Sequence, residues 1–145
     1  MRIVNYTNIP TRVVREIIRF VRPDKRLGRF SMLIDEGKAP WAGVAQFTKS
    51  NIFPSLPIEK PTIVIKIPPQ GSQIRRSDGR PVDRVEMLVF LLAHELRHFW
   101  QGNHPRLVDL EDEKALERDA DTYAYERLED WRCSRNLEVR RVAGE

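Results

Sequence analysis

Residues 83–102 read DRVEMLVFLLAHELRHFWQG, a stretch that contains no proline and has its only glycine at the end. Asp83 followed three residues later by Glu86 is typical of a helix N-terminus, where each side chain can bond the backbone N–H of the other residue. Gly102 stands where the end of a helix favours glycine. The stretch therefore predicts a long helix over residues 85–101.

This helix carries the pattern HExxH at His94, Glu95 and His98. A spacing of four residues puts both imidazoles on one face, a turn apart, where they can bind one metal ion. From its place beside the first histidine, the Glu95 carboxylate can reach a metal-bound water and act as a general base. The alternative is two buried core histidines, which do not require a glutamate beside them. We therefore expect a catalytic metal site, with zinc as the default ion.

Catalytic zinc sites usually have three protein ligands, and two residues compete for the third place. Glu117 stands 19 residues after His98 on a second predicted helix, although alone it could be an ordinary surface acid. Asp121, one turn further along, can accept the spare N–H of a ligand histidine. His104 has the third-histidine spacing of HExxHxxGxxH, but the glycine of that pattern falls at Gln101 and no methionine follows the helix. We favour Glu117 and keep His104 as the alternative third ligand.

The apolar patterns of the remaining chain predict a small α+β protein. Helical spacing predicts helices over residues 11–21 and about 109–134, and β-branched or alternating runs predict strands over 30–35, 43–48 and 62–67. We therefore expect an N-terminal helix, a small three-stranded mixed sheet, an active-site helix and a glutamate helix, with the helices packed on one face of the sheet.

Length and composition restrict the class of protein. The chain has 145 residues, of which 41% are hydrophobic, and this predicts a single domain over residues 1–145. The longest apolar run is too short to cross a bilayer, no signal peptide is evident, and the lone cysteine is typical of a reducing compartment. We expect a cytoplasmic protein without a membrane segment. The net charge of +4 is diffuse and accompanies no nucleic-acid-binding motif, so a nucleic-acid partner is disfavoured.

The histidine motif and the acidic motif together resemble those of zinc metallopeptidases of the gluzincin type. HELRH at residues 94–98 followed by ERDAD at residues 117–121 is similar to that family's HExxH and glutamate-helix motifs, and the small size resembles the minigluzincins. The resemblance implies a zincin-like fold with Zn²⁺ as cofactor and a peptide or protein substrate. It also implies site residues, namely His94, His98 and Glu117 as zinc ligands, Glu95 as the base, and Asp121 behind a ligand histidine.

In zincins an extended peptide pairs with an exposed edge strand, and the resemblance places that strand at residues 43–48. An alternative is that this strand is simply packed in the sheet. Larger gluzincins stabilise the oxyanion with a histidine or tyrosine from a C-terminal subdomain, for which this chain leaves about ten residues. Tyr123 or Tyr125 could supply such a hydroxyl, although core and surface tyrosines are more common.

Two functions follow from these patterns. The first is a zinc-dependent metalloendopeptidase, in which Glu95 activates a zinc-bound water to hydrolyse a peptide bond. The second is a binding or regulatory module on a zincin scaffold, with weak or latent proteolytic activity. The intact Glu95 favours the first function, because a structural zinc site has no use for a general base.

Overall fold

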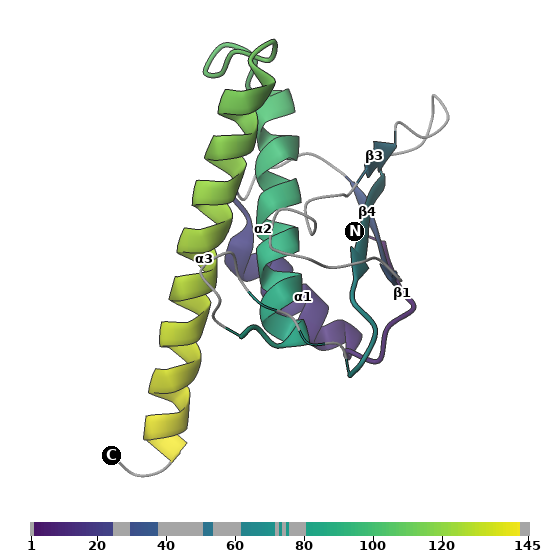
Figure 1. Cartoon of the computed structure of the whole chain (residues 1–145), viewed down its shortest axis with the longest axis vertical. Coiled ribbons are helices and arrows are strands. Elements are labelled where there is room, and N and C mark those ends of the chain that lie inside the picture. The colour runs from purple at the N-terminus through teal and green to yellow at the C-terminus, as the bar shows by residue number, and fades with distance from the viewer. Residues whose placement is uncertain are drawn as a thin grey trace.

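A computed structural model of the chain describes residues 2–24, 30–37, 51–53, 62–71, 73, 75 and 81–142. The elements are, in chain order, β1 (Ile3–Asn5), α1 (Thr11–Val21), β2 (Ser31–Glu36), β3 (Asn51–Phe53), β4 (Thr62–Ile67), α2 (Arg84–Asn103) and α3 (Glu113–Val142). The fold is α+β, as predicted, and all three helices lie on one side of the sheet (Figure 1). Among the helices of the described residues, none combines the length and apolar character that a membrane span requires.

The sheet has four described strands in the order β1-β2-β4-β3. β2 pairs in parallel with β1 and with β4, and β3 adds an antiparallel edge strand beside β4. The expected number of three strands is wrong, because the described residues form four. The three neighbouring strands β1, β2 and β4 are parallel rather than mixed, and β3 adds the antiparallel pairing. β1 and β3 have three residues each, too few to show an alternating pattern in the sequence. The strand predicted over residues 43–48, and with it the predicted peptide-binding edge, lies outside the described residues.

α2 begins where the sequence predicts and ends two residues later than expected. The Asp83 side chain accepts a hydrogen bond from Glu86 N–H, and the Glu86 side chain accepts one from Asp83 N–H, which confirms the predicted start. The expectation that Gly102 ends the helix is wrong, because the helix continues through it and His104 is the cap residue. The helix stops at His104 because Pro105 follows, and a residue before proline disfavours the helical conformation.

α3 starts later and ends later than the predicted range of about 109–134. Asp112 precedes it, and the Asp112 side chain accepts a hydrogen bond from Ala115 N–H, so the helix begins at Glu113. No glycine or proline follows before Gly144, and the helix runs on to Val142 although its apolar stripe has ended. The α1 range of residues 11–21 is confirmed.

The core lies between the sheet and the helices. Alternate residues of β2 and β4 are buried in it, namely Met32, Ile34, Ile63, Ile65 and Ile67. α2 contacts β4, α1 and α3, so its residues 87–96 are buried on every side. The HExxH pattern starts inside this buried stretch. The fold therefore places the first histidine and the glutamate of the pattern in the core.

Candidate metal centre

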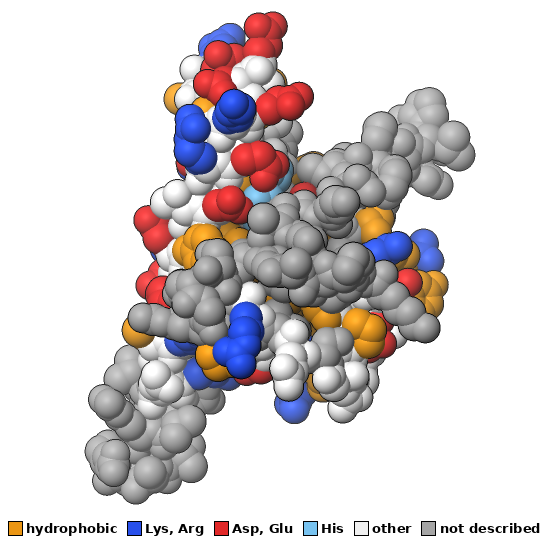
Figure 2. Space-filling model, in the orientation of Figure 1, with side chains coloured by type: hydrophobic (Ala, Val, Ile, Leu, Met, Phe, Trp, Pro, Cys, Tyr) orange, Lys and Arg blue, Asp and Glu red, His pale blue; other side chains and the backbone are white. Residues whose placement is uncertain are grey.

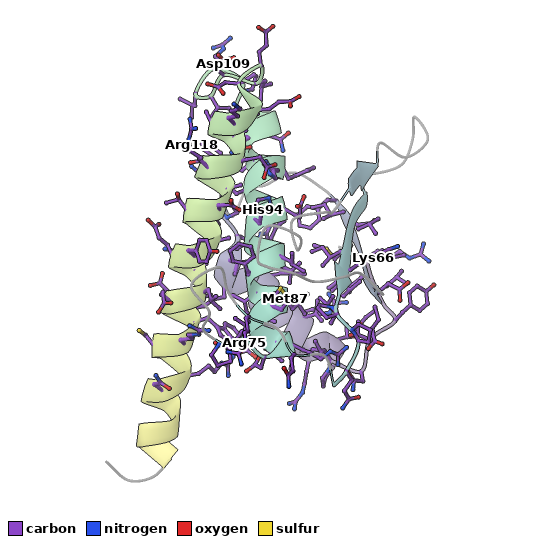
Figure 3. The ribbon with its side chains drawn as sticks, viewed as in Figure 1. Lys66, Arg75, Met87, His94, Asp109 and Arg118 are labelled. Carbon is purple, nitrogen blue, oxygen red and sulfur yellow. The ribbon has the colours of Figure 1, made fainter. Side chains whose placement is uncertain are left out.

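Three side chains from α2 and α3 converge halfway along α2. His98 Nε2 lies 3.0 Å from His94 Nε2 and 2.9 Å from Glu117 Oε1. His94 Nε2 lies 3.4 Å from Glu117 Oε2. Two atoms that each lie about 2.0–2.1 Å from a tetrahedral zinc ion are separated by about 3.3 Å, so the nitrogens and the carboxylate of these three residues lie close to the spacing of a zinc site. Figure 3 shows His94 on the side of α2 that faces α3.

The outer nitrogen of His98 is held by an amide. His98 Nδ1 lies 2.8 Å from Gln101 Oε1. The Gln101 amide nitrogen donates to the Leu116 carbonyl and to the Asp119 carboxylate, so its oxygen is the atom that faces the histidine. The ring therefore carries its proton on Nδ1, and Nε2 is left as a lone pair that faces the other ligands.

The outer nitrogen of His94 faces a carboxylate. His94 Nδ1 lies 2.9 Å from Asp121 Oδ1, although the pair does not have the geometry of a hydrogen bond. A carboxylate at this distance favours the proton on Nδ1 of this ring as well. Both Nε2 lone pairs and the Glu117 carboxylate then point at one another with no donor between them. A cation bound among them removes that repulsion, and the donor set of two imidazoles and one carboxylate fits zinc.

The environment of His94 keeps it in the form that binds metals. Its side chain is fully buried, and this burial is the main reason why the pKa of His94 falls to about 4. The nearby His98 lowers the pKa further, whereas the charge of Glu117 raises it. The imidazole is therefore neutral near pH 7. Neutral imidazole is the state in which histidine ligates a metal ion, so no proton has to leave this ligand.

Glu95 lies beside the cluster, and one of its oxygens has no hydrogen-bond partner within the part of the chain that the structure describes. The residue is 3% exposed, and its Oε1 lies 3.8 Å from His94 Nε2 without a hydrogen bond. Burial and the nearby charge of Glu117 raise the pKa of Glu95 to about 8. A buried carboxylate oxygen without a partner costs free energy and requires an explanation. Its position against the three ligand atoms indicates a role toward a molecule that binds there.

The cluster is open to one side. The side chains of Glu117 and Asp121 are 53% and 44% exposed, whereas that of His98 is 19% exposed. Figure 2 shows histidine atoms at the surface between acidic side chains. A molecule can therefore approach the ligand atoms from the side of α3, while Glu95 remains on the side of the core.

The structure places His104 away from this cluster. Its Nδ1 lies 2.7 Å from the Trp100 carbonyl, and its ring stacks on the Trp100 ring with centroids 4.4 Å apart. Among the described residues, the group that can hold a metal ion consists of His94, His98 and Glu117. Of the two predicted candidates for the third ligand, the structure brings Glu117 to the histidines.

The two tyrosines near the glutamate motif make contacts of their own. Tyr123 donates its hydroxyl hydrogen bond to the Val21 carbonyl at the end of α1, so this hydroxyl does not point at the cluster. The Tyr125 ring packs against Phe90 with ring centroids 4.9 Å apart. Phe90 lies one turn before His94, and the Tyr125 ring therefore packs next to the site.

Three residues that the sequence motifs do not single out support the site. Gln101 contacts His98, Asp119 accepts from Gln101, and Arg97 donates to Asp119 at 2.7 Å and 3.2 Å. Hydrogen bonds from Arg97 contribute most to lowering the pKa of Asp119. A signal for Gln101 exists in the sequence, because a residue three positions after His98 lies on the same helix face.

Comparisons with protein-family models, with curated proteins and with solved structures gave no significant match to this chain.

Proposed function

We propose that this chain is a zinc-dependent metalloendopeptidase of the gluzincin type. The observation that carries the proposal is the convergence of acceptor atoms from His94, His98 and Glu117 beside the buried carboxylate of Glu95. Structural zinc sites are closed by four protein ligands, whereas three ligands leave a position for a reactant. A buried carboxyl group next to that position is what a hydrolytic site needs and a structural site does not.

Each residue has a separate role in this proposal. His94, His98 and Glu117 hold the ion, and zinc, when bound, supplies a Lewis acid that polarises a peptide carbonyl and makes water more acidic. Glu95 accepts a proton from the attacking water and returns it to the departing nitrogen. In the metal-free chain, burial and the nearby charge of Glu117 raise the pKa of Glu95 to about 8. A divalent cation bound beside this carboxyl group would favour its ionised form, which is the form that accepts a proton.

The test compares the wild-type chain with Glu95→Gln, which keeps the size of the side chain. We expect about one zinc ion per chain in both proteins by elemental analysis, because Glu95 is not a ligand. Cleavage of a peptide library, followed by mass spectrometry, is expected to be at least about 100-fold slower in the variant.

The matched control is Glu111→Gln, which changes an exposed acid between α2 and α3 and is expected to cleave at the wild-type rate. A wild-type chain that binds no zinc after reconstitution contradicts the proposal. Equal cleavage by wild type and Glu95→Gln contradicts the role of Glu95.

One observation favours the alternative function, a binding or regulatory module with weak or latent activity. The Tyr123 hydroxyl is bonded to the Val21 carbonyl and does not serve as an oxyanion donor. A zinc site without that donor hydrolyses slowly. A stoichiometric peptide or protein complex that forms equally well with Glu95→Gln, and without cleavage, would support this alternative.

A further inference from the structure

Gln101 is buried although its side chain is polar, which among the described residues is otherwise true of His94 and Glu95. It is 1% exposed, although the residues that follow it, Gly102 and Asn103, are exposed. Burying an amide costs free energy unless its donors and acceptor are satisfied. Among the described residues, its side chain contacts groups around the ligand cluster, namely His98, the Leu116 carbonyl and Asp119.

We propose that Gln101 is a positioning residue of the metal centre, which fixes the tautomer of His98 and holds α3 in register with α2. This inference rests on the proposed function, because it assumes that His98 and Glu117 are ligands of one ion.

The contacts of the amide nitrogen determine which way the amide group points. Nε2 lies 2.9 Å from the Leu116 carbonyl oxygen and 2.8 Å from Asp119 Oδ2. If the amide were turned over, its oxygen would face those two acceptors and both hydrogen bonds would be lost. Oε1 therefore faces His98 Nδ1 and accepts a hydrogen bond from its N–H. This leaves Nε2 of His98 unprotonated, which is the state that ligation requires.

The same amide ties the second helix to the first. Leu116 immediately precedes Glu117, so a hydrogen bond to its carbonyl fixes the backbone of α3 next to the carboxylate ligand. Gln101 thus contacts the ligand histidine on one side and, on the other, the backbone of α3 next to the ligand glutamate. One side chain sets the distance between ligands from two helices.

Arg97 holds the far end of this arrangement. Its guanidinium donates two hydrogen bonds to Asp119, with distances of 2.7 Å and 3.2 Å, and Asp119 in turn accepts from Gln101. The guanidinium carbon lies 4.0 Å from the centroid of the Trp100 ring, which restricts its movement. Such outer partners commonly change metal affinity by about 10- to 100-fold when they are removed.

The experiment compares two substitutions at this position. Gln101→Met keeps the length of the side chain and removes every hydrogen bond. Gln101→Glu keeps an acceptor for His98 Nδ1 and removes the donors toward α3. The readouts are the histidine tautomer in the metal-free protein, by ¹⁵N–¹H correlation NMR, and the affinity for zinc, by competition with a chelating dye.

We expect His98 to carry its proton on Nδ1 in the wild type and in Gln101→Glu, and to lose that preference in Gln101→Met. The zinc affinity of Gln101→Met is expected to fall by about 10- to 100-fold, and Gln101→Glu should bind zinc more tightly than Gln101→Met. Asn103→Ala is the matched control, because it removes an exposed amide on the same helix whose hydrogen bond, among the described residues, goes to the Phe99 carbonyl. It should not change either readout.

A folded Gln101→Met variant that binds zinc as tightly as the wild type would overturn the inference and leave the proposed function standing. A wild-type His98 with its proton on Nε2 would overturn it too. If Gln101→Met does not fold, the Gln101→Glu variant decides. His98 with its proton on Nδ1, together with bound zinc, supports the inference. His98 with its proton on Nε2, together with wild-type zinc affinity, overturns it. A wild-type chain that binds no zinc contradicts the proposed function. The role of Gln101 toward His98 can still be tested then, because the tautomer is measured in the metal-free protein.

Discussion

α2 and α3 contribute to the candidate site from opposite environments. The α2 residues His94 and Glu95 are 0% and 3% exposed and lie in the apolar core. The α3 residues Glu117 and Asp121 have side chains that are about half exposed, at 53% and 44%. The site is therefore assembled where a buried helix face meets a hydrated one.

The difference shows which half of the site lowers the stability of the fold. Buried ionisable groups are costly, and their pKa values shift toward the neutral form, downward for His94 and upward for Glu95. Glu117, which is half exposed, carries less of this cost, whereas burial still raises the pKa of Asp121. Substitutions on the two helices should therefore affect zinc binding and the free energy of unfolding in different proportions.

The largest effect is expected for His94→Leu. Removal of a ligand should weaken zinc binding by more than about 100-fold, because two protein ligands do not complete a zinc site. The free energy of unfolding of the metal-free protein should not fall, since an apolar side chain replaces a buried polar one. Chelator competition and urea unfolding measure the two quantities. A His94→Leu variant that is much less stable than the wild type but still binds zinc would contradict this prediction.

The second effect is a dependence of metal-free stability on pH. The pKa of Glu95 rises from 4.5 to about 8 on folding, so the folded state binds more protons between these values and stability falls as pH rises. The pKa of His94 falls from 6.5 to about 4, so its contribution to stability rises between pH 4 and 6.5. The two effects oppose each other below pH 6.5, and only that of Glu95 remains above it.

We therefore expect the metal-free protein to lose roughly 1 to 2 kcal/mol of stability between pH 6.5 and 8. Urea unfolding at a series of pH values measures this loss. Glu95→Gln cannot ionise and should show a flat profile over the same range. A variant with the same slope as the wild type would show that another group titrates.

On the side of α3, Glu117→Ala separates binding from folding. Loss of the third ligand should weaken zinc binding at least about tenfold. The free energy of unfolding of the metal-free protein should stay within about 0.5 kcal/mol, because the side chain is half exposed. His104→Ala is the control and should leave zinc affinity unchanged. Unchanged affinity in Glu117→Ala with a large loss in His104→Ala would move the site to three histidines.

The sequence predicts the elements that have strong local signals. The capping pair Asp83 and Glu86, the proline-bounded strand Thr62–Ile67 and the range of α1 are confirmed because each depends on neighbours within a few residues. β1 and β3 escape prediction because three-residue strands exist only through their pairing partners. The end of α3 escapes prediction because no glycine or proline marks it in the sequence.

The candidate site also combines residues that a local sequence pattern predicts with residues that only the tertiary packing brings in. The HExxH spacing places His94 and His98 together from local geometry alone, whereas Glu117 reaches them through the packing of two helices. In the sequence, Gln101 shows as a departure from the HExxHxxGxxH pattern and lies three residues after His98, on the same helix face. Its role depends on the Leu116 carbonyl and Asp119 of the other helix, 15 and 18 residues away, and no local pattern reports such contacts.

The smallest effect concerns the part of α3 that serves the fold rather than the site. Tyr123→Phe removes a hydrogen bond to the Val21 carbonyl and leaves that acceptor at the end of α1 without its partner. We expect a loss of about 1 kcal/mol in the free energy of unfolding, with zinc affinity and cleavage unchanged. Urea unfolding and the peptide-library assay measure both. If cleavage falls while stability does not, the hydroxyl turns toward the substrate during reaction, and α3 supplies an oxyanion donor as well as a ligand.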